Sequence, residues 1–330
     1  MEFTTGKSHL RAVVHHFGPA IESVQLESYA PALLKVGELR VKMQFSTINP
    51  SDLITISGAY SSRIPLPFVP GFEGVGIVEA GSELVGQRVL PLGSAGAWQQ
   101  YKHCDANWCF AVPDWLTDEQ AATCYVNPMT AWLMLTEALA AAPGMKIVVS
   151  AANSTIGLML IRMAKRLGLT VTAIVRHAGA ENVVDNAEPD ELLILPHTGN
   201  TTYSNPLPLI GDADAVLDCV GGKTAMKLAG MVRQGGKFIS YGLLSGDPIP
   251  ASFWRYRPDI RFSYFHLRQW VHTAGRDALA AKLNEIFPLI RDGIASSRIA
   301  GIFPLNELPA ALSVMSQNSS QGKILIHCDR

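Results

Sequence analysis

One stretch decides the fold of this chain: Lys146-Ile-Val-Val-Ser-Ala-Ala-Asn-Ser-Thr-Ile-Gly157, continued by Leu158-Met-Leu-Ile-Arg-Met-Ala-Lys-Arg-Leu-Gly168. Its start, 147–150, is a short apolar run that is typical of a buried parallel strand. A turn of small residues follows over 151–154. From Ile156 to Leu167 apolar side chains recur at helical spacing, and Gly168 ends the helix. A strand, a tight turn and a helix in this order open a dinucleotide-binding βαβ unit, in which the helix N-terminus receives a pyrophosphate.

The glycine fingerprint of such a unit is only partly present. Aligned with G-x-G-x-x-G, the chain has Ala152, Ser154 and Gly157, so only the third glycine remains. Alanine and serine are small enough to let a ligand approach the backbone. The alternative is an ordinary strand-to-helix turn in a fold that binds no nucleotide.

The sequence that follows favours the nucleotide interpretation. Further strands are expected at 170–175, 192–195, 215–219, 237–241 and 261–265, with helical segments between most of them, for example 224–232. Strands that alternate with helices are typical of an α/β fold with a doubly wound parallel sheet, the Rossmann sheet.

Composition and charge exclude several classes of protein. Hydrophobic residues make up 48% of the 330 residues and charged residues 17%, which is typical of a compact soluble chain with about two domains. The net charge of −1 gives no electrostatic footprint for nucleic acid or an anionic membrane. The five cysteines are scattered without C-x-x-C spacing, which argues against a disulfide framework and a zinc cluster. Strand-like sequence begins near Leu10, so we expect no targeting peptide and a cytoplasmic protein.

The first 124 residues are rich in glycine and proline and favour short strands. We expect strands at 10–15, 38–46, 74–80 and 87–91, and the region as a whole to form an irregular β-barrel-like domain. Later, 303–315 is expected to form a strand and then a helix, and 322–326 a closing strand.

Several motifs together carry a resemblance to a known family. They are Asn49-Pro-Ser-Asp52, Ser57-Gly-Ala-Tyr60, Pro70-Gly-Phe-Glu-Gly-Val-Gly76, Val126-Asn-Pro-Met-Thr-Ala-Trp132, Gly235-Gly-Lys-Phe-Ile-Ser-Tyr-Gly242, Phe265-His-Leu-Arg-Gln-Trp270 and Gly322-Lys-Ile-Leu325. The chain resembles the medium-chain dehydrogenase/reductase superfamily over essentially its whole length. The resemblance implies a GroES-like catalytic domain, 1–124 with 301–330, and a Rossmann domain, 125–300.

The same resemblance argues against a metal. Zinc alcohol dehydrogenases of the superfamily have Gly-His-Glu where this chain has Gly71-Phe72-Glu73, and the phenylalanine cannot bind zinc. No cysteine lies near Asn49–Asp52, where another ligand would stand. Because a catalytic zinc needs at least three protein ligands, we expect none here.

Without a metal, Tyr60 is the candidate acid. It is similar to the tyrosine of the Gly-x-Tyr loop in the zinc-free branch that reduces 2-enoyl thioesters, and a phenol can donate a proton to a carbanion or enolate. The alternative is a loop tyrosine packed on Pro65 or Pro67. Arg63 and Trp270 are the candidate substrate contacts.

The end of the second Rossmann strand indicates the cofactor. An NAD site places an acid there, whereas this chain has Val175-Arg176-His177 and no acid before Glu181. A cation suits a 2′-phosphate, so NADPH is expected; the alternative is a solvated surface arginine. The full set of cofactor contacts expected is Asn127, Thr130, Asn153, Ser154, Thr155, Ile156, Gly157, Arg176, His177, Cys219, Tyr241, Gly242, Leu243, Leu244, Phe265, His266, Leu267 and Lys323.

Two of these regions have open alternatives. Asn127 can lie beside the nicotinamide, cap a helix, or do both. Arginines and aromatic residues alternate over 253–270, which is consistent either with a mouth for a CoA-type phosphate or with an edge strand at a dimer interface. The family pattern has Trp at position 266, and the histidine here leaves the substrate range open.

The sequence therefore predicts an NADPH-dependent reductase of an α,β-unsaturated carbonyl compound, with a 2-enoyl thioester as first choice. The alternatives are an NADPH:quinone oxidoreductase and a non-enzymatic NADPH-binding protein similar to the zeta-crystallins. The resemblance also implies a homodimer, with a small molecule as substrate and neither nucleic acid nor membrane as partner.

Overall fold

A computed structural model describes residues 8–195, 211–318 and 321–329 of the protein. The chain divides into two compact units. Unit 1 comprises 1–126 and 274–330, and unit 2 comprises 127–273. The domain boundaries expected from the sequence, near 124 and 301, stay a prediction.

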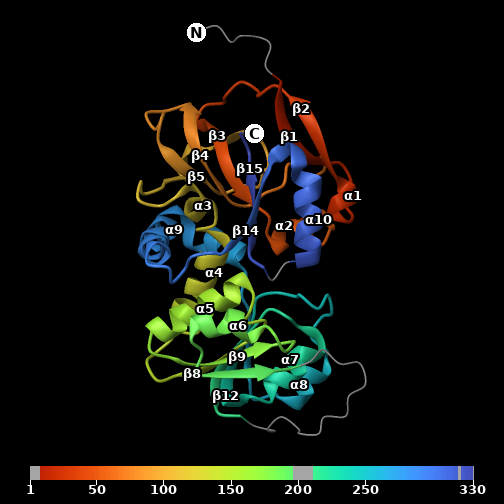
Figure 1. Ribbon diagram of the computed structural model, residues 1–330, viewed down its shortest axis with the longest axis vertical. Helices are drawn as coiled ribbons and strands as arrows, with labels where there is room; N and C mark the ends of the chain where they lie inside the picture. Colours follow the sequence, from red (N-terminus) through yellow and green to blue (C-terminus); the bar gives the residue numbers. More distant parts are fainter. Residues whose placement is uncertain (1–7, 196–210, 319–320, 330) are drawn as a thin grey trace. The chain divides into compact units, whose positions relative to one another are not determined.

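Unit 2 is built on a parallel sheet of six strands (Figure 1). The strands are β8 (Lys146–Val149), β9 (Thr170–Val175), β10 (Glu191–Ile194), β11 (Ala213–Asp218), β12 (Val232–Ser240) and β13 (Arg261–Tyr264). Their order across the sheet is β10-β9-β8-β11-β12-β13, and every neighbouring pair is parallel. Counted within the unit this is 3-2-1-4-5-6, the order of a dinucleotide-binding Rossmann sheet. The α/β fold class expected from the sequence is confirmed.

The helices of unit 2 follow most of its strands. They are α4 (Val126–Leu133), the π-helix η2 (Met134–Ala138), α5 (Thr155–Arg166), α6 (Glu181–Val184), η3 (Asp185–Ala187), α7 (Gly222–Ala229), α8 (Ser252–Tyr256) and the start of α9 (Leu267–Arg291). Helix α5 packs on β8 and β9, and α7 packs on β11 and β12. The helix expected at 224–232 was placed too late, because Val232 already pairs with Ala213 at the start of β12.

The buried residues of unit 2 match the apolar pattern of its sequence. The central strands are buried along most of their length, for example at Val148 in β8 and Val216 in β11. Helix α5 buries Met159, Leu160 and Met163 on the face that meets the sheet. Phe238 and Phe253 are fully buried, with ring centroids 5.1 Å apart. These rings fill the space between the sheet and α8.

Unit 1 contains a mixed sheet that the C-terminal segment completes. Its strands are β3 (Glu38–Thr47), β4 (Gly74–Ala80), β5 (Arg88–Pro91), β6 (Tyr101–Asp105), β7 (Cys109–Ala111), β14 (Ile299–Pro304) and β15 (Lys323–His327), and a separate hairpin joins β1 (His9–Val14) to β2 (Val24–Tyr29). The sheet order is β14-β15-β3-β4-β5-β7, with β6 also paired to β3. In Figure 1 the blue strand β15 therefore lies beside the orange strand β3, and Leu325 pairs with Thr47.

Short helices and one long one cover this sheet. They are α1 (Ala20–Ser23), α2 (Pro50–Ile56), η1 (Ala106–Trp108), α3 (Asp118–Ala122), η4 (Leu305–Glu307), α10 (Leu308–Asn318) and the later part of α9, which is interrupted at Gly275. The core includes Trp98, whose indole N–H donates to the Thr47 carbonyl across 3.1 Å. Among the described residues no helix is both long and apolar enough to cross a bilayer.

Candidate functional site

The order of the strands in the Rossmann sheet reverses between β8 and β11. Polar groups at the carboxyl ends of these two strands are joined by hydrogen bonds. The Ser150 hydroxyl donates to Asp218 Oδ1 across 2.6 Å and accepts from the Cys219 N–H at 3.0 Å. The Asp218 carboxylate also accepts from the Val220 and Gly221 N–H groups, each at 3.0 Å. Burial raises the pKa of Asp218, and these three donors oppose that rise. This carboxylate therefore orders the loop that follows β11, at the position where Rossmann folds bind their ligands.

The turn between β8 and α5 keeps the shape of a glycine turn although two glycines are missing. Ala151 takes a left-handed conformation with φ +45°, which favours glycine. The Ala152 N–H donates to the Ile174 carbonyl at 2.9 Å. At Gly157 a Cβ atom would lie 2.6 Å from the Ala151 oxygen and 2.7 Å from the Ala152 oxygen. The third glycine is therefore required for the close approach of helix and turn.

Helix α5 begins with free donors. The Ser154 hydroxyl accepts from the Gly157 N–H across 3.1 Å and caps the helix. The N–H groups of Thr155 and Ile156 donate to no residue in the described part of the chain. The end of the helix thus offers two unpaired donors and the positive end of its dipole to an anion.

Arg176 and His177 follow β9 directly and are both exposed. Within the described residues no hydrogen bond or ion pair engages Arg176, so its guanidinium is available to a ligand. Strand β9 neighbours β8, whose turn presents the free donors of α5. A cation at this strand end is suited to a phosphate on the ribose rather than to a free hydroxyl.

The ends of β11 and β12 lie close together. A Cβ atom at Gly242 would meet the Cys219 Cβ and carbonyl oxygen at 3.0 Å each, so a side chain there would crowd Cys219. The Cys219 thiol is buried, and burial raises its pKa to about 12. The Tyr241 hydroxyl is buried without a hydrogen-bond partner among the described residues. Leu243 and Leu244 follow and are exposed.

The last strand and the following helix place the remaining nucleotide-side candidates. The Phe265 N–H donates to the Ser240 carbonyl at 2.8 Å, which continues the β12–β13 pairing. His266 is exposed and Leu267 half-buried. The Trp270 indole donates to Glu137 Oε2 across 2.6 Å, so this side chain is oriented by the π-helix η2.

The basic and aromatic residues of 253–270 do not act as one surface. Arg257 is buried, pairs with Asp259 at 2.7 Å and donates to the Ala229 carbonyl at 2.5 Å. Phe253 is part of the core. Trp254, Tyr256 and Tyr264 are exposed, and β13 is an edge strand of the sheet. Arg257 therefore stabilises the fold and cannot belong to a phosphate-binding mouth.

In unit 1, Tyr60 lies in the turns after α2 and is 39% exposed. Gly58 just before it has φ +92°, a conformation that favours glycine. The Tyr60 carbonyl accepts from the Arg63 and Ile64 N–H groups at 2.9 and 3.2 Å, which closes the turn. No described residue hydrogen-bonds the Tyr60 hydroxyl, and the Arg63 side chain is exposed.

A cluster of buried polar side chains lies below α2. The Asn49 side chain donates to Glu73 Oε1 across 2.9 Å and accepts from the Lys323 ammonium. Burial lowers the pKa of Lys323, and the negative charges of Glu73 and Asp52 oppose that shift. Lys323 is thus held inside unit 1 by a contact between residues 274 positions apart.

Asp52 and Glu73 also satisfy backbone donors. Asp52 accepts from the N–H groups of Asn49 at 2.8 Å and Phe72 at 3.0 Å, and burial raises its pKa to about 7. Glu73 Oε2 accepts from the Tyr125 and Val126 N–H groups at 3.2 and 2.7 Å. Glu73 therefore caps α4, which begins at Val126. The helix start expected from an Asn127 cap is two residues late, because this carboxylate already satisfies the first donors.

Asn127 and Thr130 are half-buried residues three positions apart on α4, so they lie on one side of the helix. The described residues contain no group of three or more His, Cys, Asp or Glu side chains placed to hold a metal ion.

Comparison with known proteins identifies the family. Residues 35–114 match the alcohol dehydrogenase GroES-like domain and residues 178–326 the zinc-binding dehydrogenase family. Mitochondrial enoyl-[acyl-carrier-protein] reductases of Rattus norvegicus and Homo sapiens are each 30% identical over 326 residues, which cover 92% of this chain and 85% of each relative. The chain belongs to the medium-chain dehydrogenase/reductase superfamily. It is an oxidoreductase of this superfamily.

Solved structures of the superfamily share the fold. A Bacillus thuringiensis protein, provisionally described as an NADPH:quinone reductase, is 31% identical with a TM-score of 0.88, covering 98% of this chain and 99% of its own. Escherichia coli quinone oxidoreductase, solved with NADPH, is 23% identical with a TM-score of 0.84, covering 96% and 99%. The second likeness supports the fold alone.

The structure brings together part of the expected superfamily site. Asn153 to Gly157, Cys219, Tyr241 and Gly242 stand at or beside the carboxyl ends of β8, β11 and β12. Sequence reasoning missed Ser150 and Asp218, which order this edge, and Asp52, which lies in the buried cluster. The signal for Asp218 was an acid directly after the apolar run 215–217, at the end of β11.

Proposed function

We propose that this protein reduces the carbon–carbon double bond of a 2-enoyl thioester, with NADPH as the reductant. The observation that carries the proposal is Arg176, which pairs with no described residue, at the end of β9 in a 3-2-1-4-5-6 sheet. The chain is 30% identical to enoyl reductases over 92% of its length. The arginine supports NADPH as the coenzyme, and the relatives support a 2-enoyl thioester as the substrate.

The donor set fits the phosphates of this coenzyme. The unpaired N–H groups of Thr155 and Ile156 would hold the pyrophosphate, and Arg176 would hold the 2′-phosphate, with His177 beside it. Gly242 removes a side chain where the ribose and nicotinamide would lie against the backbone. The Tyr241 hydroxyl is buried beside the Cys219 thiol on the same side. When bound, NADPH supplies the hydride that adds to the β-carbon of the substrate.

The remaining chemistry is assigned to the chain's own groups. We assign Tyr60 as the donor of the proton that the α-carbon receives, because its hydroxyl is exposed and is free of partners among the described residues. When hydride adds to the β-carbon, negative charge builds on the carbonyl oxygen of the substrate. Hydrogen-bond donors that face this oxygen would stabilise the charge. Asn127 and Thr130 would orient the nicotinamide end from α4. Arg63 and Trp270 stay the candidate substrate contacts. Lys323 stays a candidate cofactor contact, and its ammonium donates to the Asn49 side chain.

The experiment is an NADPH oxidation assay with three acceptors: crotonyl-CoA, a simple enone and a benzoquinone. The proposal expects turnover with crotonyl-CoA and formation of butanoyl-CoA. Turnover with the benzoquinone alone would instead support a quinone reductase, which the 31% identical Bacillus thuringiensis structure favours as the second candidate. Tight NADPH binding without turnover of any acceptor would support a non-enzymatic NADPH-binding protein.

We further propose a homodimer, because no strand among the described residues pairs with the outer edge of β13, which carries exposed aromatic residues. Light scattering at micromolar concentration would give twice the mass of the chain if this is right, and the mass of one chain if it is wrong. We propose the cytoplasm as its compartment, although the relatives named above are mitochondrial; cell fractionation decides this.

A further inference from the structure

Two cysteines of unit 1 lie in contact. Cys104 stands near the end of β6 and Cys109 at the start of β7, and η1 folds back between them so that their sulfur atoms are 3.2 Å apart. Both are free thiols and nearly fully buried, at 4% and 5% exposure. A disulfide needs a sulfur separation of about 2 Å, so a small side-chain movement would close the bond.

A buried cation stands on the same side of β6 as Cys104. Lys102 is two residues earlier on the strand, and its side chain is fully buried. Its ammonium donates to the Pro91 and Ser94 carbonyls at 2.7 Å each. No carboxylate among the described residues pairs with it. The two sulfur atoms share a hydrogen bond, and this bond together with the Lys102 charge lowers the pKa of Cys104. The same bond and burial raise the pKa of Cys109. A thiolate in this pair is therefore stabilised, as reactive cysteines require.

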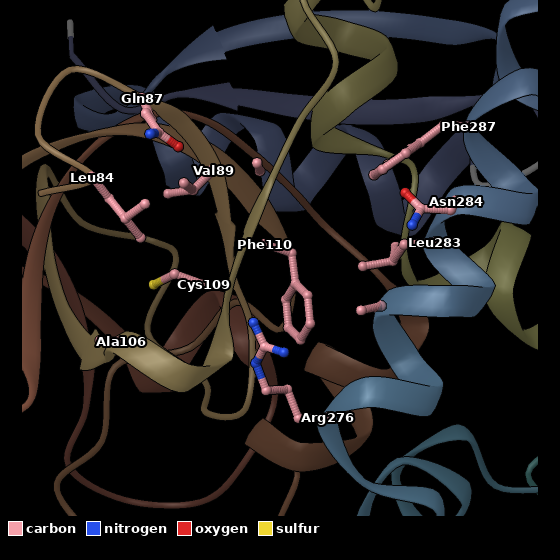
Figure 2. A pocket seen from close by; sticks show the side chains of 12 residues that line it. Leu84, Gln87, Val89, Ala106, Cys109, Phe110, Arg276, Leu283, Asn284 and Phe287 are labelled. Carbon is pink, nitrogen blue, oxygen red and sulfur yellow. The ribbon is translucent and has the colours of Figure 1, made fainter.

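The pair also has a route to solvent. Cys109 lines a pocket of about 310 Å³ in unit 1 (Figure 2). Phe110, Leu283 and Phe287 form apolar parts of its wall. Arg276 lies at its side, with its guanidinium 5.8 Å from the Phe110 ring centroid. The other three cysteines, Cys124, Cys219 and Cys328, are equally buried but do not line this pocket.

From this geometry we propose that Cys104 and Cys109 form an oxidisable dithiol, which a small peroxide entering the pocket converts to an intramolecular disulfide. The Cys104 thiolate accepts the proton of Cys109 as the Cys109 sulfur, which lines the pocket, attacks one peroxide oxygen. The O–O bond breaks, and the expelled oxygen leaves as water after taking a proton. The Cys104 sulfur then attacks the sulfur of the Cys109 sulfenic acid, the S–O bond breaks, and a second water leaves. Two thiols and one peroxide give one disulfide and two waters, so the protein is oxidised and the peroxide reduced.

This modification site is independent of the reductase chemistry. The test treats the folded protein with hydrogen peroxide, blocks remaining thiols in denaturant with an alkylating reagent, and maps the peptides by mass spectrometry. Trypsin alone leaves Cys104, Cys109 and Cys124 in one fragment, because Lys146 is the next cleavage site after Lys102. Cleavage by chymotrypsin after Trp108 and Trp115 separates all three, so that only a disulfide can keep the first two peptides together.

The expected result is a Cys104–Cys109 linked peptide pair that dithiothreitol separates, while Cys124, Cys219 and Cys328 are still alkylated. The Cys104→Ala protein should instead be oxidised at Cys109 without any linked pair, and the Cys328→Ala protein should behave like the wild type. The peptide map of the peroxide-treated wild-type protein is sufficient to test the proposal, so the test does not depend on whether a variant folds. Alkylation of both Cys104 and Cys109 after treatment, or oxidation of Cys109 to a sulfinic acid with no linked pair, would overturn the proposal.

Discussion

The Ser150 hydroxyl donates to the Asp218 carboxylate across 2.6 Å and so joins the ends of β8 and β11, the two strands between which the Rossmann sheet reverses. Replacing Ser150 by Ala leaves a buried carboxylate with one donor fewer and the Cys219 N–H without its acceptor. We expect the free energy of unfolding to fall by about 1–3 kcal/mol. Urea denaturation measures this. The matched control is Ser263→Ala on the exposed edge strand β13, which should change stability little; equal losses in both variants would contradict the assigned role.

Arg176 should distinguish the two nicotinamide coenzymes. We expect Arg176→Ala to weaken NADPH binding by roughly 10- to 100-fold, since a hydrogen-bonded charge contributes about 1.5–3 kcal/mol, while NADH binding changes little. Arg166→Ala removes the same charge from the exposed end of α5 and should leave both affinities near wild type. Titration calorimetry measures all four values. If Arg176→Ala loses affinity for NADPH and NADH equally, Arg176 does not bind the 2′-phosphate.

Asp52 gives the buried cluster a dependence on pH. Its pKa is raised to about 7 in the folded protein, against about 3.9 in an unfolded chain. Between these values the folded state binds more protons, so the contribution of Asp52 to stability is greatest below about pH 4 and falls as pH rises to 7. Asp52→Asn should remove this decline when unfolding is measured across the range.

A control of opposite sign is available in unit 2. Lys165 lowers the pKa of Asp190 through an ion pair at 2.6 Å. The stability from Asp190 is therefore present above its unfolded pKa and is lost as pH falls through its folded pKa. Asp190→Asn should alter the acid side of the profile only. If Asp52→Asn, like Asp190→Asn, changes the stability only at low pH, the raised pKa assigned to Asp52 is wrong.

The regular elements of the fold were readable from the sequence. The strands at 74–80 and 170–175 have the expected bounds, because apolar and β-branched runs there are flanked by polar or glycine residues. The strands β2, β6 and β7 were not foreseen. Strands β2 and β6 contain charged residues such as Glu27 and Lys102, which interrupt an apolar pattern, and β7 is only three residues long. The long helix α9 was missed because Gly275 and Pro288 interrupt its pattern.

The candidate site was predictable only where it follows from local sequence. The β8–α5 turn and Arg176 are set by residues close in the chain. The buried cluster joins Asn49 to Glu73 and Lys323, and no local pattern places three charged or polar residues in a core. Charged and polar residues are usually predicted to be exposed. That prediction is wrong here because each of these side chains has a hydrogen-bonding partner that permits its burial.

Tyr60 should control turnover without controlling cofactor binding. If its hydroxyl donates the proton, Tyr60→Phe should lower kcat for crotonyl-CoA by roughly 10²- to 10⁴-fold and leave NADPH affinity near wild type. Tyr256→Phe removes a hydroxyl of similar exposure from α8 and should retain full turnover. A Tyr60→Phe protein that keeps most of its activity would exclude this phenol as the acid.

The most direct measurement follows one deuterium atom. Crotonyl-CoA is incubated in ordinary water with the protein and NADPH that carries deuterium at the transferred position of C4, and the butanoyl-CoA product is examined by NMR. We expect deuterium at the β-carbon and a solvent-derived hydrogen at the α-carbon. Deuterium at the α-carbon, or no product from a protein that binds NADPH, would contradict it.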